Sequence, residues 1–116
     1  SLGAVNSKST VQTITVNSTL TAAMTGDTIC NTGATAGASL TLPTCAAGLW
    51  YDFISTDADS MIIYCASGDS IFSAAVLKPS IEGHAVNQSL RVKGVPTNGG
   101  QFNWIVQFSV GTWTGY

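Results

Sequence analysis

Side chains that could take part in catalysis are few and scattered along this sequence. His84 is the single histidine, and a hydrolase that used it would need a nucleophilic serine and a carboxylate beside it. No Gly-x-Ser-x-Gly turn is present to expose such a serine. A glycoside hydrolase would instead need two carboxylates flanking the scissile bond. Such a pair would have to come from six carboxylates: Asp27, Asp52, Asp57, Asp59, Asp69 and Glu82. Most of these lie in turn signals, so we expect no enzyme.

Candidate metal ligands are equally sparse. The cysteine nearest to His84 is far away in the sequence, and an isolated histidine rarely binds a metal alone. Asp57 and Asp59 have the Asp-x-Asp spacing of a calcium loop. The rest of such a loop is missing, so a simple turn is expected and a bound calcium ion is the alternative. We therefore expect no metal and no cofactor.

The cysteines allow two interpretations. Cys30, Cys45 and Cys65 are odd in number, and none forms a Cys-x-x-Cys pair. This usage is typical of small buried apolar residues in a reducing compartment. A disulfide between Cys30 and Cys45, or between Cys45 and Cys65, is the alternative.

Charge is scarce throughout the 116 residues. Charged residues make up 9% of the chain, against about 25% in a typical domain. Hydrophobic residues reach 45% and the net charge is −2, which excludes a disordered composition. Lys8, Lys78, Arg91 and Lys93 do not form a basic patch, so nucleic-acid binding is not expected. No apolar run reaches 18 residues, so no transmembrane helix and no membrane partner are expected.

Aromatic side chains are the remaining candidates for binding. Trp50, Tyr51, Trp104 and Trp113 could stack on sugar rings if they were exposed. Trp104 follows an alternating apolar pattern, which places it in the core. For Trp50 and Trp113, a subunit interface explains the residue type as well as a ligand does.

The elements that must position these residues are organised around the stretch from 31 to 54. Leu49, Tyr51 and Phe53 alternate with Trp50, Asp52 and Ile54, so both faces of this predicted strand carry large apolar groups. We expect both faces to be covered. A second sheet with a loop, or another copy of the chain, can supply that cover.

Other strands follow from period-two alternation and turn residues. Val86, Leu90 and Val92 should face inward, with Gln88 as an exception. Asn98-Gly99 predicts a hairpin into a strand from 102 to 110, with one apolar face: Phe102, Trp104, Val106, Phe108 and Val110. Further strands are expected at 11–16, 28–30, 39–42, 61–65, 71–72 and 74–77, and a weaker one at 20–24.

These patterns predict an all-β fold without amphipathic helices. About eight short strands at intervals of about 8–12 residues favour a compact antiparallel β-sandwich or barrel of jelly-roll type. Residues 1–16 are expected to form an extended N-terminal arm and the first strand. Residues 17–116 are expected to form the β domain.

Several short segments, in this order and spacing, resemble one known type of domain. They are Thr19–Ala23, Gly26–Thr28, Asn31–Thr35, Leu40–Pro43, Ala47–Leu49, Gly68–Ile71 and Gly111–Thr114. Together they resemble a small β domain of tailed-bacteriophage virions, which occurs in capsid decoration proteins and in C-terminal domains of head or tail appendages. The resemblance covers residues 19 to 114, and the sequence departs from it at its three cysteines.

The resemblance implies a homotrimeric structural protein of the virion, without enzymatic activity. Such a protein assembles in the host cytoplasm, binds the major capsid protein on the capsid exterior and stabilises the shell. The residues agree independently, because a chain with few charges and a two-faced apolar strand suits burial against its own copies. We expect the arm from 1 to 16 to contact the capsid or a neighbouring trimer. The expected contact residues are Leu2, Val5, Ile14, Trp50 and Trp113.

Two other functions stay open at this point. One is a receptor-binding or glycan-binding tip domain of a phage fibre, in which exposed aromatic residues recognise the host. The other is an enzyme acting on a host polysaccharide, which would need a pair of carboxylates that the sequence does not place together.

Overall fold

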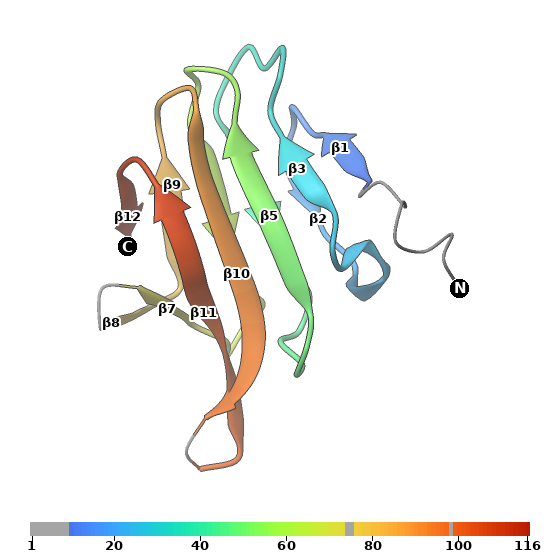
Figure 1. Ribbon diagram of the computed structural model, residues 1–116, viewed down its shortest axis with the longest axis vertical. Coiled ribbons are helices and arrows are strands. Elements are labelled where there is room, and N and C mark those ends of the chain that lie inside the picture. The colour runs from blue at the N-terminus through green and yellow to red at the C-terminus, as the bar shows by residue number, and fades with distance from the viewer. Residues whose placement is uncertain (1–9, 74–75, 98) are drawn as a thin grey trace, which may run out of the picture.

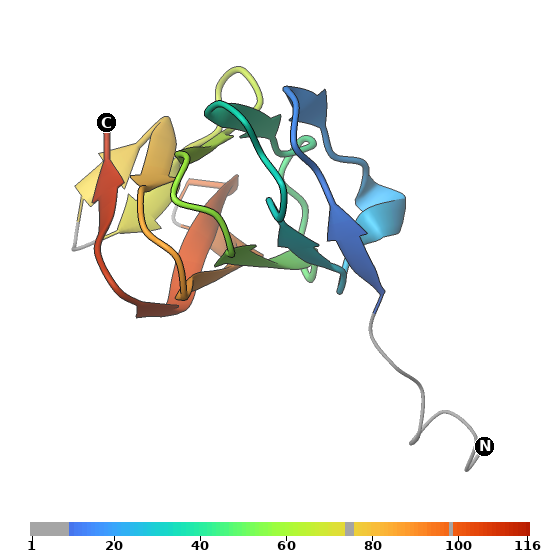
Figure 2. The ribbon, with the colours of Figure 1, turned by 90° about the horizontal axis from the view of Figure 1, so that it is seen from above.

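The structure, a computed structural model, describes residues 10–73, 76–97 and 99–116. Its regular elements are twelve β-strands and one short 3-10 turn, so the predicted all-β fold is confirmed. The strands form two separate sheets that lie against each other as a sandwich (Figure 2). Leu2 and Val5 lie outside the described residues.

The two sheets differ in size. The large sheet has seven strands in the order β1 (Val11–Thr13), β3 (Thr28–Cys30), β5 (Trp50–Ser55), β10 (Gln88–Thr97), β11 (Gln101–Val110), β7 (Ile71–Ser73) and β8 (Val76–Lys78). The small sheet has five, in the order β12 (Trp113–Gly115), β9 (Ser80–Gly83), β6 (Met61–Tyr64), β4 (Ala38–Thr41) and β2 (Ser18–Thr19). The predicted strand at 20–24 is wrong, since Ala22–Met24 form the 3-10 turn η2.

The first six strands wind alternately through the two sheets. β1, β3 and β5 pair in parallel in the large sheet, while β2, β4 and β6 pair in parallel in the small one. Each strand is therefore followed by a connection that crosses to the other sheet (Figure 2). Positive φ angles at Gly26, Gly33 and Gly48 mark three of these connections. The sheets are consequently mixed, whereas the sequence led us to expect antiparallel strands.

The second half of the chain adds antiparallel strands. β10 pairs with both β5 and β11, and β9 pairs with both β6 and β12. The hairpin predicted between β10 and β11 is present, with positive φ at Gly99 and Gly100 in its connection. The paired ends of this hairpin are Thr97 and Gln101. The hairpin extends as the long lower projection in Figure 1.

One irregularity changes which residues of β11 face the core. Val92 pairs with Val106, but Arg91 pairs with Phe108, so Gln107 is an extra residue that forms a β-bulge. The bulge reverses the alternation beyond it. Phe108 and Val110 therefore lie on the outer face of the large sheet, and the single apolar face predicted for β11 is wrong at these two positions.

The core lies between the two sheets. It contains the inward-facing residues of nearly every strand, all essentially buried: Leu20, Ile29, Leu40, Leu42, Tyr51, Phe53, Met61, Ile63, Ile71, Ile81, Leu90, Val92 and Trp104. The rings of Tyr51 and Trp104 lie 5.7 Å apart, and the Tyr51 hydroxyl donates a hydrogen bond to the Thr21 carbonyl at 2.7 Å. The predicted core position of Trp104 is confirmed.

The turn before β10 differs from the prediction. Val86 is 49% exposed, so its predicted inward position is wrong. Asn87 has a φ of 64°, and the strand begins only after it. Gln88 is buried because its amide oxygen accepts the backbone N–H groups of His84 and Ala85, and its amide nitrogen donates to the Thr112 carbonyl. The buried glutamine thus ties the turn to the segment before β12.

Candidate interaction surfaces

The central strand β5 is covered on one face only by its own chain. Tyr51 and Phe53 are fully buried against the small sheet, while Trp50, Asp52 and Ile54 remain half-buried on the opposite, outer face. The expected cover on both faces is thus only partly supplied within one copy. The outer face of the large sheet is therefore a surface left for a partner.

A charged cluster lies at the middle of this outer face. The Arg91 guanidinium donates hydrogen bonds to both carboxylate oxygens of Asp52, at 2.6 and 2.9 Å. It also lies between two rings, 4.7 Å from the Trp50 centroid and 5.0 Å from the Phe108 centroid. The hydrogen bond with Asp52 raises the pKa of Arg91, so the side chain stays charged. The pair neutralises its own charge and leaves two aromatic rings flanking it.

Apolar side chains, interrupted by Lys93, extend across this face from the cluster to the far edge of the sheet. The strand registers place Trp50 beside Lys93, Lys93 beside Ile105, and Ile105 beside Phe72. Leu77 completes the row beside Phe72. Phe72 and Leu77 are 39% and 50% exposed. The sequence did not single out these two residues, because their place depends on the parallel pairing of β7 with β11.

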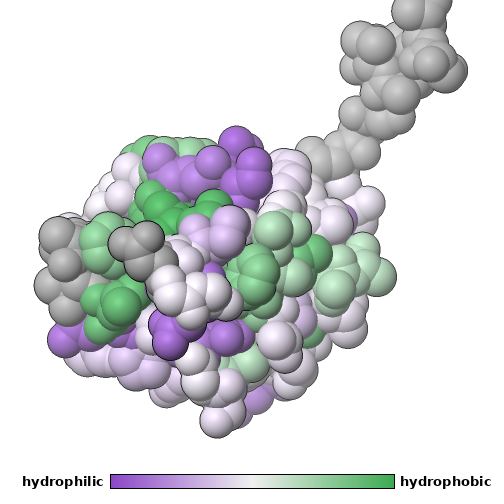
Figure 3. All heavy atoms as spheres, turned by 90° about the horizontal axis from the view of Figure 1, so that it is seen from below, coloured by the Kyte–Doolittle hydropathy of each residue, from purple (hydrophilic) through white to green (hydrophobic). Residues whose placement is uncertain are grey.

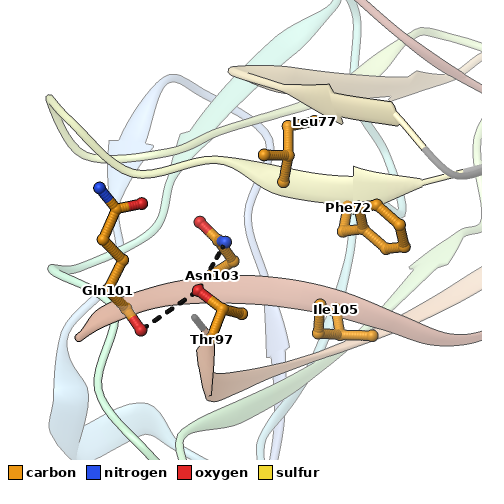
Figure 4. Close-up of a pocket in the computed structure, with 6 residues that line it drawn as sticks. All are labelled: Phe72, Leu77, Thr97, Gln101, Asn103 and Ile105. Atoms are coloured by element: carbon orange, nitrogen blue, oxygen red, sulfur yellow. Dashed lines mark hydrogen bonds between the residues drawn. The ribbon is translucent and has the colours of Figure 1, made fainter. Parts of the chain in front are cut away.

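A shallow hollow of about 350 Å³ lies at the lower end of this row (Figure 4). Phe72, Leu77 and Ile105 supply its apolar wall, while Thr97, Gln101 and Asn103 supply polar groups. The Asn103 amide donates to the Thr97 hydroxyl at 3.1 Å, and that hydroxyl donates to the Gln101 carbonyl at 3.3 Å. The hollow therefore presents an apolar wall opposite a preset polar one. Seen from below, apolar residues gather in patches with hydrophilic residues between them (Figure 3).

A second hollow, of about 640 Å³, lies on the other side of Phe72. It is lined by Phe72, Ile105, Val106, Ser109, Gly111, Thr112 and Trp113. Pairing of β11 with β7 ends at Ile105, so residues 106–110 have no strand partner on this side among the described residues. Considering the described residues, the upper half of β11 is therefore an unpaired sheet edge beside a hollow.

The described contact residues predicted from the sequence do not form one surface. Ile14 is half-buried and packs against the core next to β1. Trp50 lies on the outer face of the large sheet, in the Arg91 cluster. Trp113 lies in β12 of the small sheet, packs against the core and donates a hydrogen bond from its indole nitrogen to the Val110 carbonyl. These positions separate residues that the sequence had grouped.

The histidine has a serine and a carboxylate beside it. Nδ1 of His84 lies 3.0 Å from the Ser60 hydroxyl and 3.2 Å from a carboxylate oxygen of Glu82. A Ser-His-carboxylate relay uses one ring nitrogen for the serine and the other for the carboxylate. Here both partners meet the same nitrogen, so the arrangement does not have the relay geometry.

All three cysteines are free thiols in the structure. Burial, with a contribution from the nearby Asp69 carboxylate, raises the pKa of Cys45 to about 11. Burial, Asp69 and the neighbouring Cys45 raise the pKa of Cys65 to about 12. These two thiols are protonated near neutral pH and are weak nucleophiles.

The Asp57-Ala58-Asp59 segment forms the predicted turn. The Asp59 N–H donates to a carboxylate oxygen of Asp57 at 3.0 Å. Across residues 10–73, 76–97 and 99–116, no group of three or more His, Cys, Asp or Glu side chains could hold a metal ion. Within the same ranges, no helix has the length and apolar character needed to cross a bilayer.

Neither the known protein-family models nor the curated proteins gave a match to this sequence.

Proposed function

We propose that this chain is a structural virion protein that decorates and stabilises the capsid of a tailed bacteriophage. It acts on the capsid exterior as a homotrimer bound to the major capsid protein, and it performs no catalysis. The proposal starts from the order and spacing of the motifs described above. The geometry of the outer sheet face adds physical support.

The observation that carries the proposal is the uncovered outer face of the large sheet. Trp50, Ile105 and Phe72 lie on it half-exposed, and its central charges, Arg91 and Asp52, already neutralise each other. Apolar surface of this kind marks a site for another protein, since covering it releases water and the Arg91–Asp52 pair needs no further charged partner. Lys93 lies in the same row, so a partner must leave its ammonium group in water or supply a carboxylate. A decoration protein works by contact area, which this face provides.

Three copies would bind a shell more tightly than one. When three weak contacts are linked in a trimer, the second and third form at a high effective concentration, so the whole assembly gains avidity. We assign the capsid contact, or contact with a neighbouring trimer, to residues 1–16. The first described strand of this segment, β1, lies at an edge of the large sheet (Figure 1).

Binding to capsids that lack their decoration protein tests this function. The purified full chain should sediment as a trimer and co-sediment with such capsids. A variant lacking residues 1–10 should remain trimeric, because β1 itself is retained. It should no longer attach to the capsids, because most of the proposed contact segment is missing. A chain that stays monomeric at high concentration and never binds capsids would contradict the proposal.

A receptor-binding or glycan-binding tip of a phage fibre is the second candidate. It is favoured by the hollow in Figure 4, whose lining combines the polar side chains of Thr97, Gln101 and Asn103 with the ring of Phe72. Sugars are commonly held by amide and hydroxyl groups beside an aromatic ring. Screening of host glycans should then show binding that Phe72→Ala and Asn103→Ala remove, with Trp50→Ala as a comparison on the same face.

A further inference from the structure

Two open edges lie on opposite sides of the large sheet. β1 pairs with β3 on one side only, so its other side is the first edge of the sheet. Among the described residues, residues 106–110 of β11 form the other open edge, beyond the last residue that pairs with β7, although the Val110 carbonyl already accepts a hydrogen bond from the Trp113 indole nitrogen. An unpaired edge presents a row of backbone N–H and C=O groups to any strand that can approach. The same molecule therefore carries two different open edges, which could pair with each other between copies.

Both edge segments carry exposed apolar side chains and no charged residue of their own. Val11 at the first edge is 64% exposed, and Phe108 and Val110 at the second are 44% and 55% exposed. Lys8 is the single Asp, Glu, Lys, Arg or His outside residues 27–93, so neither residues 9–26 nor residues 94–116 contain one. Asp27 lies beside the first edge, where its carboxylate accepts a hydrogen bond from the Gln12 amide at 2.9 Å. Since the edge strands themselves contribute no charge, bringing them together avoids much of the usual cost of forming an interface.

The side-chain alternation of the two edges also matches. Val11 pairs with Thr28, which pairs with Asp52, so Val11 lies on the outer face of the sheet. Phe108 pairs with Arg91, which pairs with Asp52, so Phe108 lies on that same outer face. Without the bulge at Gln107, Phe108 would face the core. A sheet continued from one copy into the next would place these apolar side chains beside one another.

We propose that copies of this chain join head to tail, the β1 edge of one copy pairing with residues 106–110 of β11 in the next. β1 runs in the same direction as β11, because two parallel and two antiparallel pairings connect them. A rotation axis along the strands keeps these directions, so the pairing between copies is parallel. Three such contacts close a ring. This inference rests on the proposed homotrimer and names its subunit contact.

The hollow beside β11 gives the incoming strand room. Its lining includes Val106 and Ser109 of the unpaired segment and Thr112 of the connection that follows it. Opposite edges of one sheet cannot meet within one molecule, since β3, β5 and β10 lie between them (Figure 1). The partner for each edge is therefore a second copy.

Charge substitution at each edge tests the contact. Val11→Lys and Val110→Lys should each convert the trimer to monomers in sedimentation velocity. Mixed in equal amounts, the two variants should form a one-to-one dimer in native mass spectrometry. The intact β1 edge of V110K can pair with the intact β11 edge of V11K, and the remaining two edges are blocked. Val86→Lys is the matched control, since Val86 is a similarly exposed valine at neither edge, and it should remain trimeric.

The unmodified chain supplies an independent measurement. Backbone amides within residues 11–13 and 106–110 should exchange hydrogen about tenfold more slowly in the trimer than in diluted monomers. Equal exchange rates, or folded edge variants that remain trimeric, would overturn this contact while leaving the proposed trimer intact. An unmodified chain that is monomeric at every concentration would overturn both.

Discussion

At the scale of single residues, the buried Asn31 joins two connections between the sheets. It is 1% exposed, and its side-chain oxygen accepts the backbone N–H groups of Thr56 and Asp57 at 2.8 and 3.1 Å. Its amide nitrogen donates to the Asp59 carbonyl at 3.1 Å. One side chain therefore satisfies three backbone groups that the turn after β5 leaves without strand partners.

Asn31→Ala should lower the free energy of unfolding by about 1–3 kcal/mol, because the buried backbone groups would lose their partner without access to water. Asn17→Ala is the control. The Asn17 side chain also accepts a backbone N–H, from Ser39 at 2.9 Å, but it is exposed, so water can replace it. Urea unfolding of both variants measures the difference, and equal losses would contradict this role of burial.

Cys45 and Cys65 make the fold sensitive to alkaline pH. Their pKa values, raised by burial to about 11 and about 12, lie above the ordinary 9.0 of a thiol. The unfolded chain therefore releases these protons at lower pH than the folded chain does. The stability that they contribute is complete below pH 9 and is lost as pH rises toward those raised values.

We expect the free energy of unfolding to fall between pH 8 and pH 10.5, measured with urea under reducing conditions. The fall should be smaller when Cys45→Ala and Cys65→Ala are combined. Some decline should persist, since burial also raises the pKa of Tyr51. An unchanged pH dependence in the double variant would show that the two thiols are not its cause.

At the scale of the elements, β10 depends on a glycine where a connection crosses it. A Cβ atom added to Gly94 would lie 2.2 Å from the Ala46 carbonyl oxygen and 3.0 Å from Cys45 Sγ. The backbone of Gly94 also exchanges hydrogen bonds with that connection, from its N–H to Leu49 and from the Gly48 N–H to its carbonyl. The strand and the connection are too close for any side chain.

Gly94→Ala should therefore destabilise the fold by about 2–3 kcal/mol, as overpacked positions do. Gly37→Ala is the matched control. Its added methyl group would meet Ser60 Cβ at an ordinary 3.5 Å, and we expect a change within about 1 kcal/mol. Thermal unfolding of both variants measures the difference in stability. An unchanged stability of Gly94→Ala would mean that the connection containing Ala46 can shift to make room for the methyl group.

Local patterns predicted most strand positions but not how the strands pair. The runs at 28–30 and 61–65, and the Asn-Gly hairpin, were recognisable because their signals are contained within a few residues. Alternation with period two says which face a residue occupies, and it carries no information about the neighbouring strand. The alternation of the first six strands between the two sheets could not be predicted, because no sequence repeat marks it. The intervals from Val11 to Thr28 and from Thr28 to Asp52, which pair in successive strands, are unequal.

The candidate surfaces were predictable only in part. Trp50 was identified as a large apolar residue on the second face of its strand, and it does lie on the outer face. Its stacking with Arg91 and Phe108 was not visible, because the bulge at Gln107 reverses the face of Phe108. Phe72 and Leu77 looked like ordinary strand residues, and only the sheet order reveals them as lining a hollow.

At the scale of the whole molecule, stability rests on apolar contact and backbone pairing. Among the described residues only two ion pairs form, Arg91 with Asp52 and His84 with Glu82. The Arg91 and Asp52 side chains are 36% and 19% exposed, so their pair contributes about 1 kcal/mol at most. The remaining charges are too few to build a strong field.

The free energy of unfolding should therefore change by less than about 1 kcal/mol between 50 mM and 500 mM sodium chloride, because screening has little to act on. Urea unfolding at the two salt concentrations measures this change. The same measurement on Arg91→Met shows how much of the salt dependence comes from the Arg91–Asp52 pair. A large loss at high salt would reveal a dependence on electrostatics that the structure does not account for.

The alternation of the first six strands between the sheets has a consequence for how this body can change in length. Every circuit through β1 and β2, or through β3 and β4, stacks on the next circuit by backbone pairing and by apolar contacts in the core. A complete additional circuit of about twenty residues can therefore be spliced in without disturbing the hairpin half. A half circuit, with one strand, would instead place each later strand in the opposite sheet. Longer versions of such a chain should therefore differ from it by complete circuits, each with one strand in each sheet.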